Sequence, residues 1–246
     1  MELGLKGKAG KATFRLNYSL TDATFQSAFK LDSPSNSSAG ANINVAGFFN
    51  NAPKLDPGYQ KIDVTPGNRM PGIPLHNLNV SFNYDITDKW AAGLTVVMHS
   101  SAFVRGNENN KHKTGPATPL TTSCTTLEDD PNNPGNGVLV TRDCMVARPD
   151  FRYPGKTAGY AVFNFQTSYK LDKGLMLGLQ VNNLFDRYYA SAGRLGINPF
   201  SPSINGVIGV SGFNYNSSEW RSSTLIAPGA PRAAWATLTY DFDAGK

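Results

Sequence analysis

The sequence predicts an all-β chain, an antiparallel transmembrane sheet of about seven strands that forms a segment of a β-barrel. Two observations predict this fold class. Apolar and polar residues alternate along seven stretches of the chain, and short connections between these stretches alternate with long ones. Because successive side chains of a strand point to opposite faces, a period of two indicates strands with one apolar face.

The strands follow one another in chain order. A short opening strand places Leu3 and Leu5 on one face, and six further strands repeat the alternation: residues 13–21, 77–86, 90–98, 163–171, 175–181 and 236–242. The opposite faces carry mainly Asn, Gln, Ser and Thr, which suit a water-filled lumen. We expect the convex, lipid-facing side to include Leu78, Val80, Phe82, Leu94, Val96, Leu177 and Leu179.

The connections indicate the orientation of these strands. Three connections are tight, at residues 7–11, 87–89 and 172–174, and three are long, at residues 28–73, 105–158 and 190–229. Outer-membrane barrels have short turns on the periplasmic side and long loops outside the cell. The last strand is therefore expected to end in the periplasm.

Composition and motifs exclude several other classes. Hydrophobic residues make up 40% of the 246 residues, yet no stretch approaches the roughly 20 apolar residues of a membrane helix. The formal charge is +5, but Lys and Arg are scattered, so we expect no nucleic-acid partner. Hydrolase, metalloprotease and P-loop motifs are missing from the sequence, so we predict no catalytic residue and no cofactor. The acidic run at residues 129–133 lacks the spacing of a calcium loop, and no metal site is assigned.

Four segments resemble TonB-dependent outer-membrane receptors. The family's Pro-rich entry to a late barrel strand is similar to PGNRMPGIPLHNLNVSFNY, residues 66–84. A strand exit of the family resembles SSAFVRGNENN, residues 100–110, although Asn107 stands where an acid is usual. The Asn-Leu-Phe-Asp and Tyr-Tyr signature near the end of the barrel resembles VNNLFDRYYASAG, residues 181–193, and the closing strand resembles ATLTYDF, residues 236–242.

The resemblance implies that residues 1–246 form one C-terminal portion of a 22-stranded barrel and contain its last seven strands. In the family, an N-terminal plug fills the barrel and TonB delivers energy through a short box before the plug. This sequence shows neither plug, box nor signal peptide, so we expect contact with TonB only through a plug outside it. The family usually ends on an aromatic residue, whereas four residues follow Phe242 here.

The implied function is that of a TonB-dependent transporter in the outer membrane of a Gram-negative bacterium. Its expected cargo is a ferric siderophore or another scarce, bulky nutrient, and its surroundings are outer-membrane lipid and lipopolysaccharide. Aromatic rings beside an Arg on an outer loop suit an anionic ferric chelate, although the same rings could simply pack the loop. The candidate ligand-binding residues are Phe213, Tyr215, Trp220, Arg221, Arg105 and His112. The last of these lies between two lysines, a patch that equally suits lipopolysaccharide phosphates.

The two cysteines lie in the second long connection. We predict a disulfide between Cys124 and Cys144 that staples this loop in an oxidising compartment, and two unrelated thiols are the alternative.

Two other classes of protein stay open at this point. A complete small porin-like barrel needs an even number of strands, so an eighth strand would have to lie near residues 43–49 or 138–141. A soluble all-β carbohydrate-binding domain predicts that the apolar faces turn inward.

Overall fold

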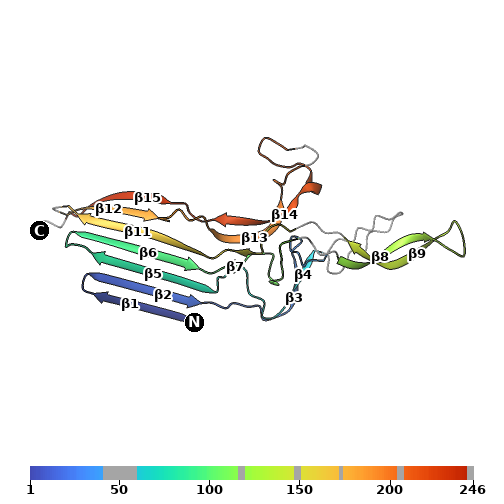
Figure 1. The fold of residues 1–246 in the computed structure, drawn as a ribbon, viewed down its shortest axis with the longest axis horizontal. Coiled ribbons are helices and arrows are strands. Elements are labelled where there is room, and N and C mark those ends of the chain that lie inside the picture. Colours follow the sequence, from blue (N-terminus) through green and yellow to red (C-terminus); the bar gives the residue numbers. More distant parts are fainter. Residues whose placement is uncertain (41–59, 116–119, 147–150, 172–173, 204–207, 243–246) are drawn as a thin grey trace.

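The computed structural model describes residues 1–40, 60–115, 120–146, 151–171, 174–203 and 208–242, with the backbone alone for residues 120–129, 141–146 and 218. Its main element is one seven-stranded antiparallel sheet in which the strands lie side by side in sequence order (Figure 1). The predicted number and order of strands are confirmed. The strands are β1 (Glu2–Ala9), β2 (Ala12–Leu20), β5 (His76–Asp85), β6 (Trp90–His99), β11 (Tyr160–Lys170), β12 (Leu175–Asn182) and β15 (Ala233–Tyr240).

The tight turns lie at one end of this sheet and the long connections at the other (Figure 1). Gly10 adopts a positive φ of 58° in the first turn, a conformation that glycine reaches without the steric cost of a Cβ atom. In the turn between β5 and β6, the Thr87 hydroxyl accepts hydrogen bonds from the backbone N–H groups of Lys89 and Trp90, at 3.3 and 3.0 Å. Local turn chemistry therefore sets the register of these hairpins.

The registers bring the apolar residues of all seven strands onto one face. One row across the sheet shows this plainly, because Phe14 lies opposite Phe82, Phe82 opposite Leu94, Leu94 opposite Phe165, and Phe165 opposite Val181. Of the predicted lipid-facing residues, Phe82, Leu177 and Leu179 are more than two-fifths exposed. A soluble domain would require these apolar side chains to converge in a closed interior. In this structure they do not.

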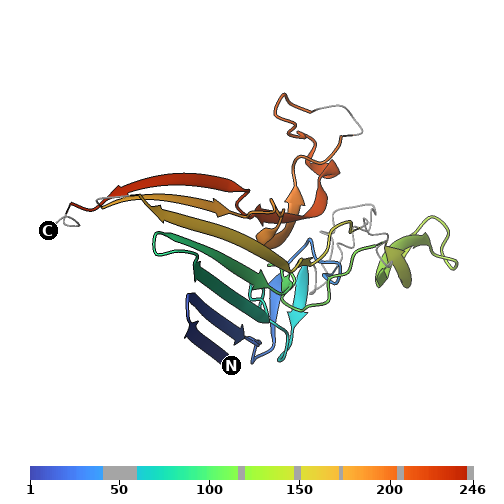
Figure 2. The same cartoon turned by 60° about the vertical axis from the view of Figure 1, so that its left-hand side comes forward.

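The opposite face is polar and contains the hollows of the sheet. Gln166 donates from Nε2 to Asn83 Oδ1 at 3.1 Å, across Gly93, where a Cβ atom would collide with the same Asn83 oxygen. Ser81 and Thr95 hydroxyls pair at 3.1 Å on the same face. Cavities of about 420 and 350 Å³ open on this face, which is what a concave, water-lined wall predicts. Figure 2 shows the sheet bent, with β1 and β15 at its two edges.

The long connections contain strands of their own, which the alternation in the sequence did not predict. These strands pair with one another in two-stranded ribbons outside the large sheet. Their bounds are β3 (Phe29–Asp32) with β4 (Lys61–Val64), β7 (Ala102–Phe103) with β10 (Lys156–Thr157), β8 (Leu120–Asp129) with β9 (Gly137–Val146), and β13 (Ala190–Asn198) with β14 (Arg221–Pro228). A short 3₁₀ helix, η1, spans Ser217–Glu219.

The ribbons bear on the eighth strand that a complete small porin-like barrel would need. Residues 138–141 belong to β9 and pair with β8, so they add no strand to the large sheet. Residues 43–49 lie outside the described residues. In the part of the chain that the structure describes, no helix is long and apolar enough to cross a membrane.

The buried core lies at the loop end. Ala39, Ile62 and Val64 are each 1% exposed and form a small cluster against Phe25 and Leu31. Among the described residues, the large sheet contributes only Val162 to the buried hydrophobic set. The large sheet is therefore stabilised mainly by the hydrogen bonds between its strands and not by a buried core of its own. The loops are held in place by the small hydrophobic cluster.

Candidate functional site

The loop ends of the strands meet in a buried polar cluster, the loop junction, made of residues 33–38, 104–113 and 153–155. Asn36 lies at its centre and is fully buried. Its Nδ2 donates to the Gly106 carbonyl at 2.7 Å, and its Oδ1 accepts from the Ser38 backbone and hydroxyl at 2.9 and 2.7 Å. Asn109 joins the same network by donating to the Ser38 hydroxyl at 2.7 Å. Such satisfied buried amides fix one arrangement of the loops.

Asn107 ties the junction to the next loop. Its Nδ2 donates to the Gly155 carbonyl at 2.9 Å, and its Oδ1 accepts from the His112 backbone at 2.9 Å. An Asp in place of Asn107 would have no N–H to donate to Gly155. The amide at this position therefore satisfies the carbonyl that faces it.

His112 lies within the junction rather than in a cationic patch. Its Nδ1 accepts from the Ser37 backbone N–H at 2.9 Å, and its Nε2 lies 3.0 Å from the Tyr153 carbonyl. An imidazole that accepts at one nitrogen and donates at the other is neutral. Burial lowers the pKa of His112, and the bond to Tyr153 opposes this shift more weakly. The positive patch predicted here is therefore reduced to the exposed Lys111 and Lys113.

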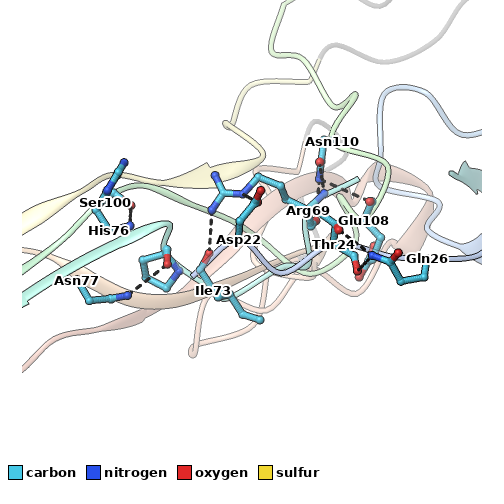
Figure 3. A network of polar contacts seen from close by, with 11 residues as sticks. Asp22, Thr24, Gln26, Arg69, Ile73, His76, Asn77, Ser100, Glu108 and Asn110 are labelled. Atoms are coloured by element: carbon cyan, nitrogen blue, oxygen red, sulfur yellow. Dashed lines mark hydrogen bonds and ion pairs between the residues drawn. The ribbon is translucent and has the colours of Figure 1, made fainter. Parts of the chain in front are cut away.

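A second polar group connects the junction to the sheet (Figure 3). Asn110 accepts from the Arg69 backbone N–H at 2.6 Å and donates to the Arg69 carbonyl at 3.0 Å. The Arg69 guanidinium donates to the Ile73 carbonyl at 3.4 Å and lies 3.7 Å from Asp22. Because Asp22 follows β2 and Ile73 precedes β5, these contacts hold two strands and the loop after β7 together.

Two arginines lie side by side at the edge of the junction. Arg105 and Arg194 form a parallel β-bridge, in which the Arg105 N–H donates to Gly193 O at 3.0 Å and the Leu195 N–H donates to Arg105 O at 2.7 Å. Both side chains are exposed and line a cavity of about 510 Å³. The sequence indicated Arg105 as a ligand residue but not Arg194, because nothing local to either residue predicts a bridge between distant loops.

The predicted aromatic residues come together in the last loop. Phe213 makes edge contacts with Tyr215 and Trp220, with ring centroids 5.1 and 5.8 Å apart, and with Phe200 at 6.0 Å. Trp220 donates from Nε1 to the Asn214 carbonyl at 2.7 Å. The rings therefore pack the loop, while Tyr215 remains 67% exposed and offers a free face.

The other two predicted groups are placed as follows. Arg221 begins β14 directly after this aromatic cluster, and its side chain is exposed. Cys124 and Cys144 lie in β8 and β9, opposite Arg142 and Thr122, and are two register positions apart. Their side chains lie outside the described residues, so the disulfide stays a prediction.

Sheet, turns and loops together define a segment of a strand-built membrane wall with an organised loop layer at one end. The family model of TonB dependent receptor-like β-barrels matches residues 1–184, and the chain belongs to this family. Members of this family are outer-membrane transport proteins rather than enzymes. No curated protein matches the chain.

Several solved structures are similar to this chain. The siderophore receptor PiuA from Acinetobacter baumannii is 14% identical over 97% of this chain and 21% of its own, with a TM-score of 0.51. The ferric-catecholate import receptor Fiu from E. coli K12, in its closed form, is 17% identical over 97% of this chain and 20% of its own, with a TM-score of 0.45. The ferric yersiniabactin uptake receptor FyuA from Yersinia pestis is 14% identical over 98% of this chain and 29% of its own, with a TM-score of 0.41. The chain spans about a fifth of the length of the first two structures.

Proposed function

We propose that the protein takes part in TonB-dependent uptake across the outer membrane and that its cargo is a ferric siderophore or another scarce, bulky nutrient. Membership of the receptor family is the observation that carries this proposal. The polar face of the sheet lines the lumen, and the loop layer supplies contacts for the cargo. TonB would act through the plug domain of the receptor.

The aromatic loop supports the proposal by its chemistry. Tyr215 presents an exposed ring, and the exposed Arg221 follows it closely in the chain. A delocalised anionic chelate is attracted by a guanidinium and stacks on an aromatic face. The packing of Phe213 against Trp220 holds the loop in one conformation. Ligand binding therefore costs little conformational entropy for ordering this loop.

Lipid and lipopolysaccharide are the proposed surroundings. The exposed apolar face matches acyl chains, and the loop lysines Lys111 and Lys113 suit lipopolysaccharide phosphates. Both lysines follow Asn109, whose Oδ1 accepts from the Lys111 backbone at 3.2 Å, so the junction holds the start of this basic segment.

Uptake of radioactive iron tests the transport proposal. The protein is expressed from its full-length gene in a strain that lacks its own siderophore receptors. We expect uptake from at least one siderophore that disappears when TonB is deleted. Leakage of small sugars that does not need TonB, with no iron uptake, would contradict the proposal and favour a passive porin.

Substitutions in the aromatic loop test the binding site. Tyr215→Ala and Arg221→Gln should reduce uptake of the transported siderophore roughly tenfold, because each removes a contact of about 1–2 kcal/mol. Tyr215→Phe keeps the ring and should retain uptake. Arg232→Gln removes a charge from an exposed residue outside the loop and is the matched control. Unchanged uptake in Tyr215→Ala and Arg221→Gln would show that this loop does not touch the cargo.

A further inference from the structure

The imidazole ring of His112 joins two long connections of the chain. Its Nδ1 accepts from the Ser37 backbone N–H at 2.9 Å, and its Nε2 lies 3.0 Å from the Tyr153 carbonyl. Ser37 belongs to the first long connection, whereas His112 and Tyr153 belong to the second. A carbonyl only accepts, so Nε2 carries the proton of the ring and Nδ1 carries none. The neutral ring is therefore the form that fits both partners.

Packing holds the ring in this position. Phe151 is 4% exposed and lies edge-on to the imidazole, with ring centroids 5.5 Å apart. A Cβ atom on Gly155 would approach the Cβ and Cδ2 atoms of His112 to 3.0 Å. The Lys113 N–H donates to the Ser37 hydroxyl at 2.8 Å, next to the contact that the ring itself makes with Ser37. Turning Nδ1 away from Ser37 would require these neighbours to move.

The charged groups around His112 do not favour a positive charge on the ring. Lys111 and Lys113 flank it in the sequence, and Arg152 lines a narrow crevice with it. Glu108, the one carboxylate of the loop junction, accepts from a backbone N–H at 3.0 Å, and the ion pairs of the described residues do not include His112. The remaining lining of the crevice is uncharged at neutral pH and consists of Ser35, Phe151, Tyr153, Leu195, Ser222 and Ser223.

We infer that His112 is an acid-sensitive latch between the first and second long connections. A proton added at Nδ1 would place one N–H donor against another, the Ser37 N–H, and the hydrogen bond between the two loops would be lost. Burial of the ring opposes the charge as well and lowers the pKa of His112. An opened loop returns the ring to water and to its ordinary pKa of about 6.5, so protonation favours the open form. The latch is closed at neutral pH and opens as the pH falls below that value.

The latch opens the junction locally. Asn36 donates to the Gly106 carbonyl at 2.7 Å, and Asn110 accepts from the Arg69 backbone N–H at 2.6 Å. These amide and backbone groups do not titrate near neutral pH, so they hold the rest of the junction when the imidazole is charged. The junction lies at the end of the sheet with the long connections (Figure 1), which face the medium in barrels of this kind. The inference does not depend on the cargo that the protein carries.

Hydrogen exchange of the protein, purified in detergent as its full-length gene encodes it, tests the latch. Exchange is followed by mass measurement at pH 7.5 and 5.5 and corrected for the intrinsic dependence of exchange on pH. This window lies above the ordinary pKa values of Asp and Glu, so histidine is the side chain that titrates in it. We expect peptides around Ser37 and Lys113 to lose protection at least threefold at pH 5.5. Peptides around Arg69, whose N–H bonds to Asn110, should keep their protection.

Substitutions of the three histidines assign the effect. His112→Gln keeps a donor and an acceptor but does not titrate, so it should remove the change with pH. His76→Gln and His99→Gln are the matched controls and should retain the change. Equal protection of the Ser37 peptides at both pH values in the natural protein, or an acid effect that persists in His112→Gln, overturns the latch.

A second variant keeps the test decisive if His112→Gln does not fold, as judged by heat-modified migration on gels. The double variant His76→Gln/His99→Gln leaves His112 as the one histidine of this chain. Loss of protection around Ser37 at pH 5.5 should persist in it, and its disappearance would overturn the assignment to His112.

Discussion

An arginine in place of Leu179 should destabilise the protein in a membrane, whereas an arginine in place of the adjacent Gln180 should not. Leu179 lies on the apolar face and is 42% exposed, and Gln180 is exposed on the polar face. Lipid cannot solvate a guanidinium, while a wet lumen can. The two substitutions introduce the same charge on the same strand, so they differ only in the face that receives it.

The magnitude follows from the position of Leu179 in β12. It is the fifth residue of Leu175–Asn182, so at a rise of about 3.3 Å it lies roughly 13 Å from the start of the strand. A strand tilt of about 40° turns this into a depth of about 10 Å in an apolar band about 25 Å tall. The residue is therefore near the midplane, where arginine costs about 2–4 kcal/mol. The equilibrium constant for folding should therefore fall by about 30-fold to 900-fold in Leu179→Arg, and by less than about threefold in Gln180→Arg.

The assay is a urea titration of the protein folded into phospholipid vesicles, followed by tryptophan fluorescence. The free energy of unfolding of each variant is compared with that of the natural protein at the same lipid composition. An equal cost for the two variants, or a larger cost for Gln180→Arg, would refute the assignment of the apolar face to lipid.

Three further predictions concern the sheet, the cysteines and the loop junction. Gly7→Ala should cost about 1–3 kcal/mol in the same titration, since its Cβ would collide with the Phe14 ring, whereas Gly4→Ala meets only an ordinary contact of 3.6 Å and should be near neutral. Alkylation and mass measurement should find Cys124 and Cys144 linked in protein from the outer membrane, a closure worth on the order of 3 kcal/mol, and two alkylated thiols would contradict it. The lowered pKa of His112 means that the unfolded chain binds its proton more readily, so the junction should be fully stable above pH 6.5 and lose stability as the pH falls toward the lowered value. Hydrogen exchange of the loop amides should show this dependence of stability on pH, and His112→Gln should remove it.

The strands and their lipid-facing residues were predictable because the signal is local. Alternation along each strand, as in Leu78, Val80 and Phe82, fixes which residues share a face. Strands that follow one another in the large sheet pair whether the connection between them is short or long. The short strands of the loops were not predicted. β3 and β4 have only four residues each, too few for alternation to stand out, and they form because their buried Ile62 and Val64 pack against distant segments.

The sequence by itself determined the membrane sheet, since a two-residue period and tight turns need no information from elsewhere in the chain. Only the tertiary structure decided the loop junction and its cavity. Arg105 and Glu108 lie in the second long connection and Arg194 in the third, and the bridge between the two arginines joins segments that are far apart in the sequence. In the sequence, Asn36 and Asn107 look like ordinary turn residues. Only the structure shows that they donate hydrogen bonds to the carbonyls of Gly106 and Gly155. The physical reason is that hydrogen bonding and charge act through space, whereas the sequence pattern records only neighbours along the chain.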